Sequence, residues 1–173
     1  MSKQGFIKLI KSVDTHNASV IELNILPGEK TPWHYHSLFS ETFEIASGTL
    51  EVGKRKSALS LTTGDRATIE PGEHHYFHNT THEECVIKVT IDPGNKNFER
   101  SLFIFKGLAH DGKASRAGTP KNIFDLALFV YLNNSRMVGI QKIAEPLFNF
   151  IARRGIKSGR LERLVSKYTV ATS

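Results

Sequence analysis

Two histidines separated by one residue, His34 and His36, are the side chains in this sequence most suited to chemistry. In a β-strand, residues i and i+2 point to the same face, so both imidazoles can be directed at one point. Glu41 follows five residues after His36, and the chain must bend through residues 37–40 if its carboxylate is to join them. Because imidazoles and a carboxylate commonly bind first-row transition metals, this segment predicts a metal site.

A second segment, residues 64–79, can supply a third histidine to the same site. A proline and a glycine at 71–72 predict a turn, and His75 follows at the start of an alternating stretch. In a regular strand, His74 and His78 would point away from the face that carries His75. Three histidines and one carboxylate would leave open positions on a five- or six-coordinate metal. Mg²⁺ and Ca²⁺ are disfavoured because they prefer oxygen ligands.

The elements that must position these side chains are short β-strands, which the sequence indicates from about residue 6 to residue 92. Ile21, Leu23 and Ile25 alternate with polar residues, a pattern typical of a half-buried strand. Ser47-Gly48 divides residues 42–52 and predicts a hairpin turn. Further turn signals lie at 64–65, 71–72 and 92–94. Many short strands with regular turns favour a sandwich or a barrel.

Two spaced motifs in this segment resemble those of the cupin superfamily. The first is filled by Gly28, His34, His36, Glu41 and Gly48. The second is filled by Gly64, Gly72, His75 and Asn79, although its proline has moved one place, from the position of Glu70 to Pro71. The resemblance covers Ile21 to Ile91. It implies a double-stranded β-helix, an antiparallel barrel that holds the metal inside. It leaves the function open, since this superfamily hosts many chemistries.

The expected cofactor is a divalent transition metal, Fe, Mn, Zn or Ni, bound by His34, His36, Glu41 and His75. Our leading hypothesis is a metal-dependent enzyme of the oxygenase or isomerase type that acts on a small polar metabolite. One alternative is a non-catalytic binding or sensor cupin, whose helical segment would respond to the bound molecule. Another is a polar barrel that binds an organic molecule without metal, but the presence of all four metal-ligating residues favours metal binding.

After Asn95 the periodicity becomes helical. Phe98, Leu102 and Phe105 fall at i, i+4 and i+7, and Asn122 can cap a helix from Ile123 to Leu132. We expect a loop at 106–119, a helix at 140–151 bent at its proline, and a basic helix at 160–167. The predicted organisation is a mainly β cupin barrel over residues 1–94. A helical appendage over residues 95–173 is expected to pack on the barrel and help close its open end.

The net charge of +6 is concentrated at the end of the chain, where residues 149–173 contain six basic side chains and one acidic one. We interpret this segment as a solvated helix face, and nucleic-acid binding is not expected because few aromatic residues accompany the charges. No apolar run is long enough to suggest a membrane span. The single cysteine, Cys85, allows no internal disulfide, so a cytoplasmic setting is expected.

The sequence also predicts features of packing and assembly. The helix at 123–132 is apolar on several sides, and the cupin resemblance implies pairing, so we expect a homodimer. Trp33 and Tyr35 are interpreted as packing residues, and Cys85 as a small core residue. The other histidines are expected at the surface, namely His16, His74, His78, His82 and His110.

Overall fold

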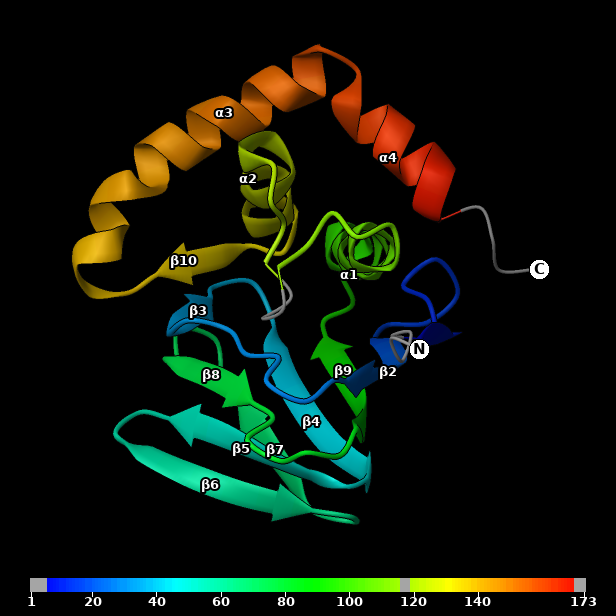
Figure 1. The fold of residues 1–173 in the computed structure, drawn as a ribbon, viewed down its shortest axis with the longest axis vertical. Helices are drawn as coiled ribbons and strands as arrows, with labels where there is room; N and C mark the ends of the chain where they lie inside the picture. Colours follow the sequence, from blue (N-terminus) through cyan, green and yellow to red (C-terminus); the bar gives the residue numbers. More distant parts are fainter. Residues whose placement is uncertain (1–5, 116–118, 170–173) are drawn as a thin grey trace.

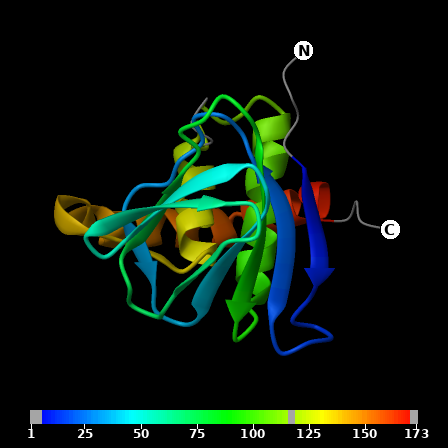
Figure 2. The same cartoon turned by 90° about the horizontal axis from the view of Figure 1, so that it is seen from below.

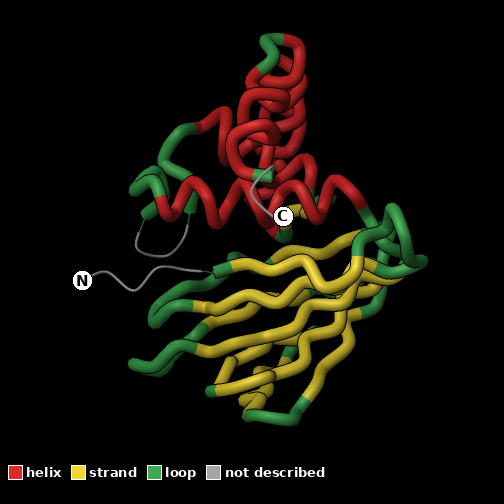
Figure 3. The backbone as a smooth tube through the Cα atoms, turned by 90° about the vertical axis from the view of Figure 1, so that its right-hand side faces the viewer, coloured by secondary structure: helices red, strands yellow, loops and turns green. Residues whose placement is uncertain are grey.

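The structure is a computed structural model, and it describes residues 6–115 and 119–169. Within these residues, two antiparallel sheets of five strands each face one another and form the barrel. The helices gather on one side of the sheets, which Figure 1 and Figure 3 show from two directions. Figure 2 shows the molecule from below, from the side away from the helices, and there the strands stand in front of the helices. The predicted class, a mainly β double-stranded barrel with C-terminal helices, is confirmed.

The first sheet follows the alternation read from the sequence. Its strands, in spatial order, are β1 (Ile7–Lys11), β2 (Ser19–Ile25), β9 (Cys85–Asp92), β4 (Ser40–Ser47) and β7 (Arg66–Ile69). Ile21 and Leu23 of β2 are buried and lie opposite Val89 and Ile87 of β9 in the antiparallel register. These alternate residues therefore form the inner face, where they help to build the barrel core.

The second sheet contains a strand from the C-terminal part of the chain. Its spatial order is β10 (Ser135–Met137), β3 (His34–His36), β8 (His75–His78), β5 (Thr49–Lys54) and β6 (Ser57–Thr62). Met137 of β10 lies opposite His34 of β3. The sequence did not predict this strand, because three residues are too few to show a strand period. The appendage thus contributes directly to a barrel sheet.

The turn at Gly48 is real, but the predicted hairpin is wrong. β4 pairs with β7 and β9 in the first sheet, whereas β5 pairs with β6 and β8 in the second. Gly48 has φ +89° and carries the chain from one sheet to the other. A Cβ at this position would lie 2.7 Å from the Glu84 carbonyl oxygen, so glycine is required by both conformation and space.

The helical segment comprises α1 (Lys96–His110), α2 (Ile123–Leu132), the 3₁₀ helix η1 (Gly139–Ala144), α3 (Glu145–Lys157) and α4 (Arg160–Tyr168). α2 matches the predicted bounds, and the Asn122 side chain caps it by accepting a hydrogen bond from the Phe124 N–H. Pro146 does not bend a helix as expected; it lies in the first turn of α3, where the missing N–H costs nothing.

The predicted loop at 106–119 was wrong at its start, because α1 continues to His110. Gly107, which falls in the expected loop, lies inside this helix and allows α4 to approach closely. A Cβ on Gly107 would lie 2.3 Å from the Tyr168 ring. Glycine is therefore used here for helix packing rather than for termination. None of the helices in the described ranges is long and apolar enough to span a membrane.

Two buried charged residues of α1 attach it to the barrel. The Glu99 carboxylate accepts hydrogen bonds from the Val13 N–H at 2.8 Å and the Ser19 hydroxyl at 2.7 Å. Near the other end of the helix, the Lys106 ammonium donates to the Asn24 carbonyl oxygen at 2.7 Å and lies 3.1 Å from a Glu29 carboxylate oxygen. Both contacts join α1 to β2 or to the loops beside it, which fixes the helix across the barrel.

Candidate metal centre

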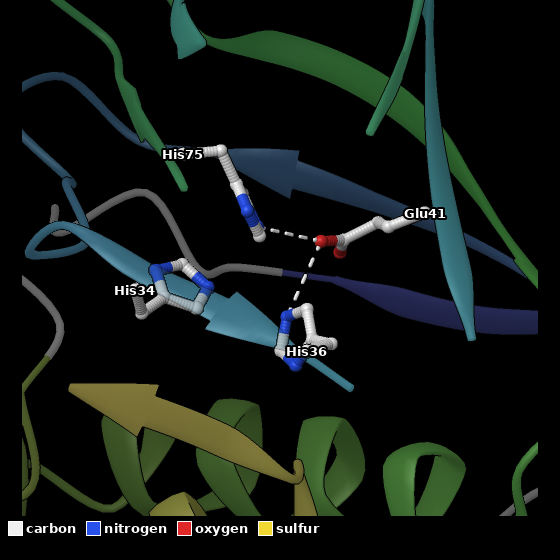
Figure 4. Close-up of side chains that lie close together, drawn as sticks. All are labelled: His34, His36, Glu41 and His75. Carbon is white, nitrogen blue, oxygen red and sulfur yellow. Dashed lines mark hydrogen bonds and ion pairs between the residues drawn. The ribbon is translucent and has the colours of Figure 1, made fainter. Parts of the chain in front are cut away.

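The structure brings together all four residues that the sequence singled out. His34 and His36 lie on the same face of β3, and His75 of β8 is the register partner of His34. Glu41 comes from β4 in the opposite sheet, which the chain reaches after the bend that the sequence required. Figure 4 shows the four side chains converging between the sheets. All four residues are buried.

The cluster has the dimensions of a possible metal site. One donor atom from each of the four side chains lies within 4.8 Å of the others. The Glu41 Oε2 atom is 3.0 Å from His75 Nε2 and 3.4 Å from His36 Nε2. No other group of three or more such side chains was found among the described residues.

Backbone carbonyls orient two of the imidazoles. His34 Nδ1 lies 2.8 Å from the Pro32 carbonyl oxygen, and His75 Nδ1 lies 3.1 Å from that of Glu73. A carbonyl only accepts hydrogen bonds, so each Nδ1 must carry the proton and donate it. In the neutral ring, Nε2 then has the free lone pair that a metal ligand needs, and such outer hydrogen bonds also fix the ring orientation.

The electrostatics of the cluster favour one carboxylate and a neutral His34. Burial, helped by the neighbouring His75 and His36, lowers the pKa of His34 to about 3. Burial opposes ionisation of Glu41, but the neighbouring imidazoles of His36 and His75 outweigh it and lower the pKa of this carboxyl. For His75, burial disfavours the charged ring, but the bond to Glu41 prevails and raises its pKa. Metal binding would therefore compete with a proton on His75.

His36 provides the test of whether a metal fits. Its ring is buried and packs on Phe39, with a centroid distance of 4.8 Å and an interplanar angle of 28°. Neither ring nitrogen makes a hydrogen bond, although Nε2 lies 3.4 Å from a Glu41 carboxylate oxygen, and these are the only buried side-chain polar atoms without a hydrogen bond found in the described chain. Buried polar groups are almost always paired. A metal coordinated by His36 would satisfy this ring, so the donor set fits the cofactor inferred from the sequence.

The other residues considered from the sequence lie outside this cluster. His16, His74, His82 and His110 are exposed, and His78 is half-buried. Cys85 is fully buried in the barrel core, and burial raises the pKa of its thiol to about 11. Trp33 packs edge-on against Tyr76, with ring centroids 4.7 Å apart. Trp33 was interpreted from the sequence as a packing residue. It also lines the cavity beside the candidate metal site.

A cavity of about 420 Å³ lies between the barrel and the helices. Its wall includes His34, His36 and Glu41, so the cluster faces the space in which a ligand would bind. Much of the wall comes from α1, α2, α3 and β10. The helical appendage was expected to help close the barrel, but the side chains that line this space could not be named, because helical periodicity identifies an apolar face without identifying what that face covers.

Lys106 and Glu29 are buried charged wall residues that were not identified from the sequence. Their ion pair is almost completely buried, with both side chains less than a tenth exposed. The two residues are far apart in sequence and follow no motif. The one available signal was the spacing of Lys106, four residues after Leu102, but the loop expected at 106–119 began at this residue.

The fold and the site define a double-stranded β-helix with a His/Glu cluster on its inner wall. Residues 21–92 match the family model described as the Cupin domain. The chain therefore carries a cupin domain, as the two sequence motifs predicted. No curated protein sequence matches the chain.

Several solved structures share the barrel fold. A protein with a double-stranded β-helix domain from Klebsiella pneumoniae is 23% identical, with a TM-score of 0.46, and the match covers 55% of this chain and 82% of that one. KdgF from Halomonas sp. is 14% identical, with a TM-score of 0.49 and coverages of 54% and 83%. An oxalate oxidase in complex with glycolate is 21% identical, with a TM-score of 0.44 and coverages of 54% and 55%.

Proposed function

We propose that this protein is a metal-dependent cupin enzyme, of the oxygenase or isomerase type, that acts on a small molecule bound in the cavity. The observation that carries the proposal is the buried cluster of His34, His36, Glu41 and His75, of which the first three line the cavity. We propose these four residues as the ligands of a divalent transition metal. Such a metal, when bound, supplies a Lewis acid or, if it is iron, a centre that activates dioxygen.

The surrounding residues prepare the site for a ligand. Neutral imidazoles and one carboxylate would leave a divalent ion with a net charge near +1, which favours an anionic or enolic group on the substrate. The Pro32 and Glu73 carbonyls hold two of the imidazoles in place. The apolar helices limit access of water, and a drier site strengthens electrostatic interactions within it. Cys85 is a free, buried thiol, which is compatible with the cytoplasmic setting that we propose.

Elemental analysis of protein purified without added metal tests the cofactor. We expect Fe, Mn, Zn or Ni in near-stoichiometric amount after exhaustive dialysis, since four converging protein ligands should retain it. Protein that contains none of these metals, and takes up none when they are supplied, would contradict the proposal.

A non-catalytic binding or sensor cupin is the second candidate. It is favoured by the large share of the cavity wall that the helices contribute, because a ligand would touch the barrel and the appendage together. Turnover of a bound compound by the Fe- or Mn-loaded protein would identify an enzyme. A compound that is bound and released unchanged would identify a sensor.

We also propose that the protein forms a homodimer through the outer surface of η1 and α3. The sequence pointed to α2, but Leu128 of that helix is fully buried and packs with Ala152 of α3. The most exposed apolar side chains of the helical segment lie at Ile143, Leu147 and Phe150, which are 80%, 58% and 60% exposed, whereas the exposed apolar side chains of α2 are 39% to 46% exposed. Exposed apolar patches of this kind commonly mark interaction surfaces.

Light scattering at micromolar concentration should give the mass of two chains. The double variant Ile143→Lys/Leu147→Lys should shift this mass toward one chain, because it places two charges in the contact. Leu59→Lys, at a 40% exposed position on β6, is the matched control and should remain dimeric. A wild-type protein with the mass of a single chain would contradict the proposed assembly.

A further inference from the structure

The helical wall of the cavity presents mainly apolar side chains to the space beside the metal site. Leu102 and Phe105 come from α1, Leu126 and Phe129 from α2, and Phe148 from α3. All five line the cavity and are only partly buried within the protein. The barrel adds Phe43 and Phe77 to this wall. A ligand that fills the cavity must therefore cover an apolar surface much larger than the His/Glu cluster.

Most polar residues of the same wall already have partners inside the protein; the Lys30 side chain, which also lines the cavity, is exposed. Lys106 and Glu29 bond to each other, and Lys106 also donates to a backbone carbonyl. The Asn133 side chain bonds to the Ser101 and Ser135 hydroxyls, and the Thr31 hydroxyl accepts from the Phe77 N–H. Apart from the exposed Lys30, the polar group of a ligand thus finds its unused partners at the His/Glu cluster, where neither ring nitrogen of His36 makes a hydrogen bond.

From this distribution we infer that the cavity takes an amphipathic acid, whose anionic head lies against the His/Glu cluster and whose apolar body lies beneath α1, α2 and α3. This inference rests on the proposed function for the contact of the head, and it replaces the small polar metabolite expected from the sequence. The volume of about 420 Å³ is within the range of roughly 300–1,000 Å³ typical of small-molecule sites. A compact dicarboxylate would leave most of the apolar wall uncovered.

A homologous series of carboxylates tests the apolar body directly. We would measure the affinity of the Zn²⁺-loaded protein for oxalate, butanoate and octanoate by isothermal titration calorimetry. Burying a methylene can tighten binding by about fourfold. Octanoate has four more methylenes than butanoate, so it should bind at least about tenfold more tightly. Oxalate or butanoate binding as tightly as octanoate, or no binding by any of the three, would overturn the inference.

Tryptophan fluorescence locates the bound chain. Trp33 lines the cavity and is the one tryptophan of the sequence, so its emission reports on this space alone. It is 38% exposed, and octanoate in the proposed position should shift its emission to shorter wavelength by removing water. Octanoate that binds without any change in Trp33 emission would count against the proposed location.

Two variants of α2 provide a matched comparison. Leu126 lines the cavity, whereas Ile123 is 46% exposed on the same helix and does not line it. Leu126→Gln places an amide against the ligand body and should weaken octanoate binding by about tenfold. Ile123→Gln should leave the affinity unchanged, and metal content should be normal in both. Equal octanoate affinity in the two variants would show that the ligand body lies elsewhere.

Measuring metal content on the same samples separates this inference from the proposed function. Protein that fails to bind metal but retains the dependence on chain length would refute the metal site and support the apolar cavity. Protein that binds metal but prefers oxalate would support the metal site and overturn the amphipathic ligand.

Discussion

Replacing His36 by alanine is expected to remove bound metal almost completely, with an affinity lowered by about 100-fold or more. Loss of an outer-shell partner alone typically costs 10- to 100-fold, and His36 is a proposed direct ligand. Its position on β3 is fixed by the sheet, so another side chain has no route into its place. The measurement is the metal content of His36→Ala after dialysis, compared with the wild-type protein.

His78→Ala is the control for this variant. His78 lies on β8 near His75, but it is half-buried and outside the cluster. We expect it to retain wild-type metal content. Equal loss of metal in both variants would mean that histidine substitutions act through general damage to the barrel, and normal metal in His36→Ala would refute the ligand assignment.

Thermal stability gives a second, independent measure of the same site. A metal present at 100 times its dissociation constant stabilises the folded state by about 2.7 kcal/mol. For a chain of this length that corresponds to an increase in Tm of roughly 5–10 °C. Adding metal to the metal-free wild-type protein should produce this increase, and adding it to His36→Ala should not. An equal increase in both would indicate binding at another site.

The parts of the structure that the sequence predicted well depend on short-range patterns. The i, i+2 spacing of His34 and His36 requires only the pleat of one strand to place both rings together. The bounds of α2 were predicted because Asn122 is a local cap and Asn133 interrupts the apolar run. Glu41 was harder to assign to the site, since it comes from the opposite sheet. The period of a single strand could not place it there, and its assignment was supported by the motif spacing of the cupin resemblance.

The parts that were missed depend on contacts between distant segments. The β10 strand exists because β3 offers it an edge, and three residues carry no period of their own. The alternation of buried and exposed residues along β4 and β5 is the same whether the two strands form a hairpin or belong to different sheets. On α1, the helical pattern did not distinguish Phe103, which is buried, from Phe105, which lines the cavity. A single sequence shows which side chains are apolar but not whether protein or ligand covers them.

Lys106→Met is expected to destabilise the protein by about 3–5 kcal/mol, because removing one partner of a buried ion pair leaves the other charge unpaired. The Lys106 side chain is 3% exposed and that of Glu29 is 6% exposed, with 3.1 Å between Nζ and Oε2. The variant also removes the donor to the Asn24 carbonyl, which joins α1 to β2. Tm should fall by roughly 10 °C or more. Because Lys106 joins α1 to β2, this experiment also tests our proposal that the appendage packs on the barrel.

The double variant Lys106→Met/Glu29→Gln should recover most of this loss, because an amide at position 29 is neutral and can still accept the hydrogen bond from the Leu26 N–H. Lys88→Met is the surface control. Lys88 is 41% exposed and its ammonium lies 3.7 Å from Glu44, so its pair should contribute at most about 1 kcal/mol. Chemical denaturation of the three variants and the wild-type protein gives the free energies of unfolding. If Lys106→Met costs no more than Lys88→Met, the buried pair does not hold α1 on the barrel, and the appendage must dock through its apolar contacts alone.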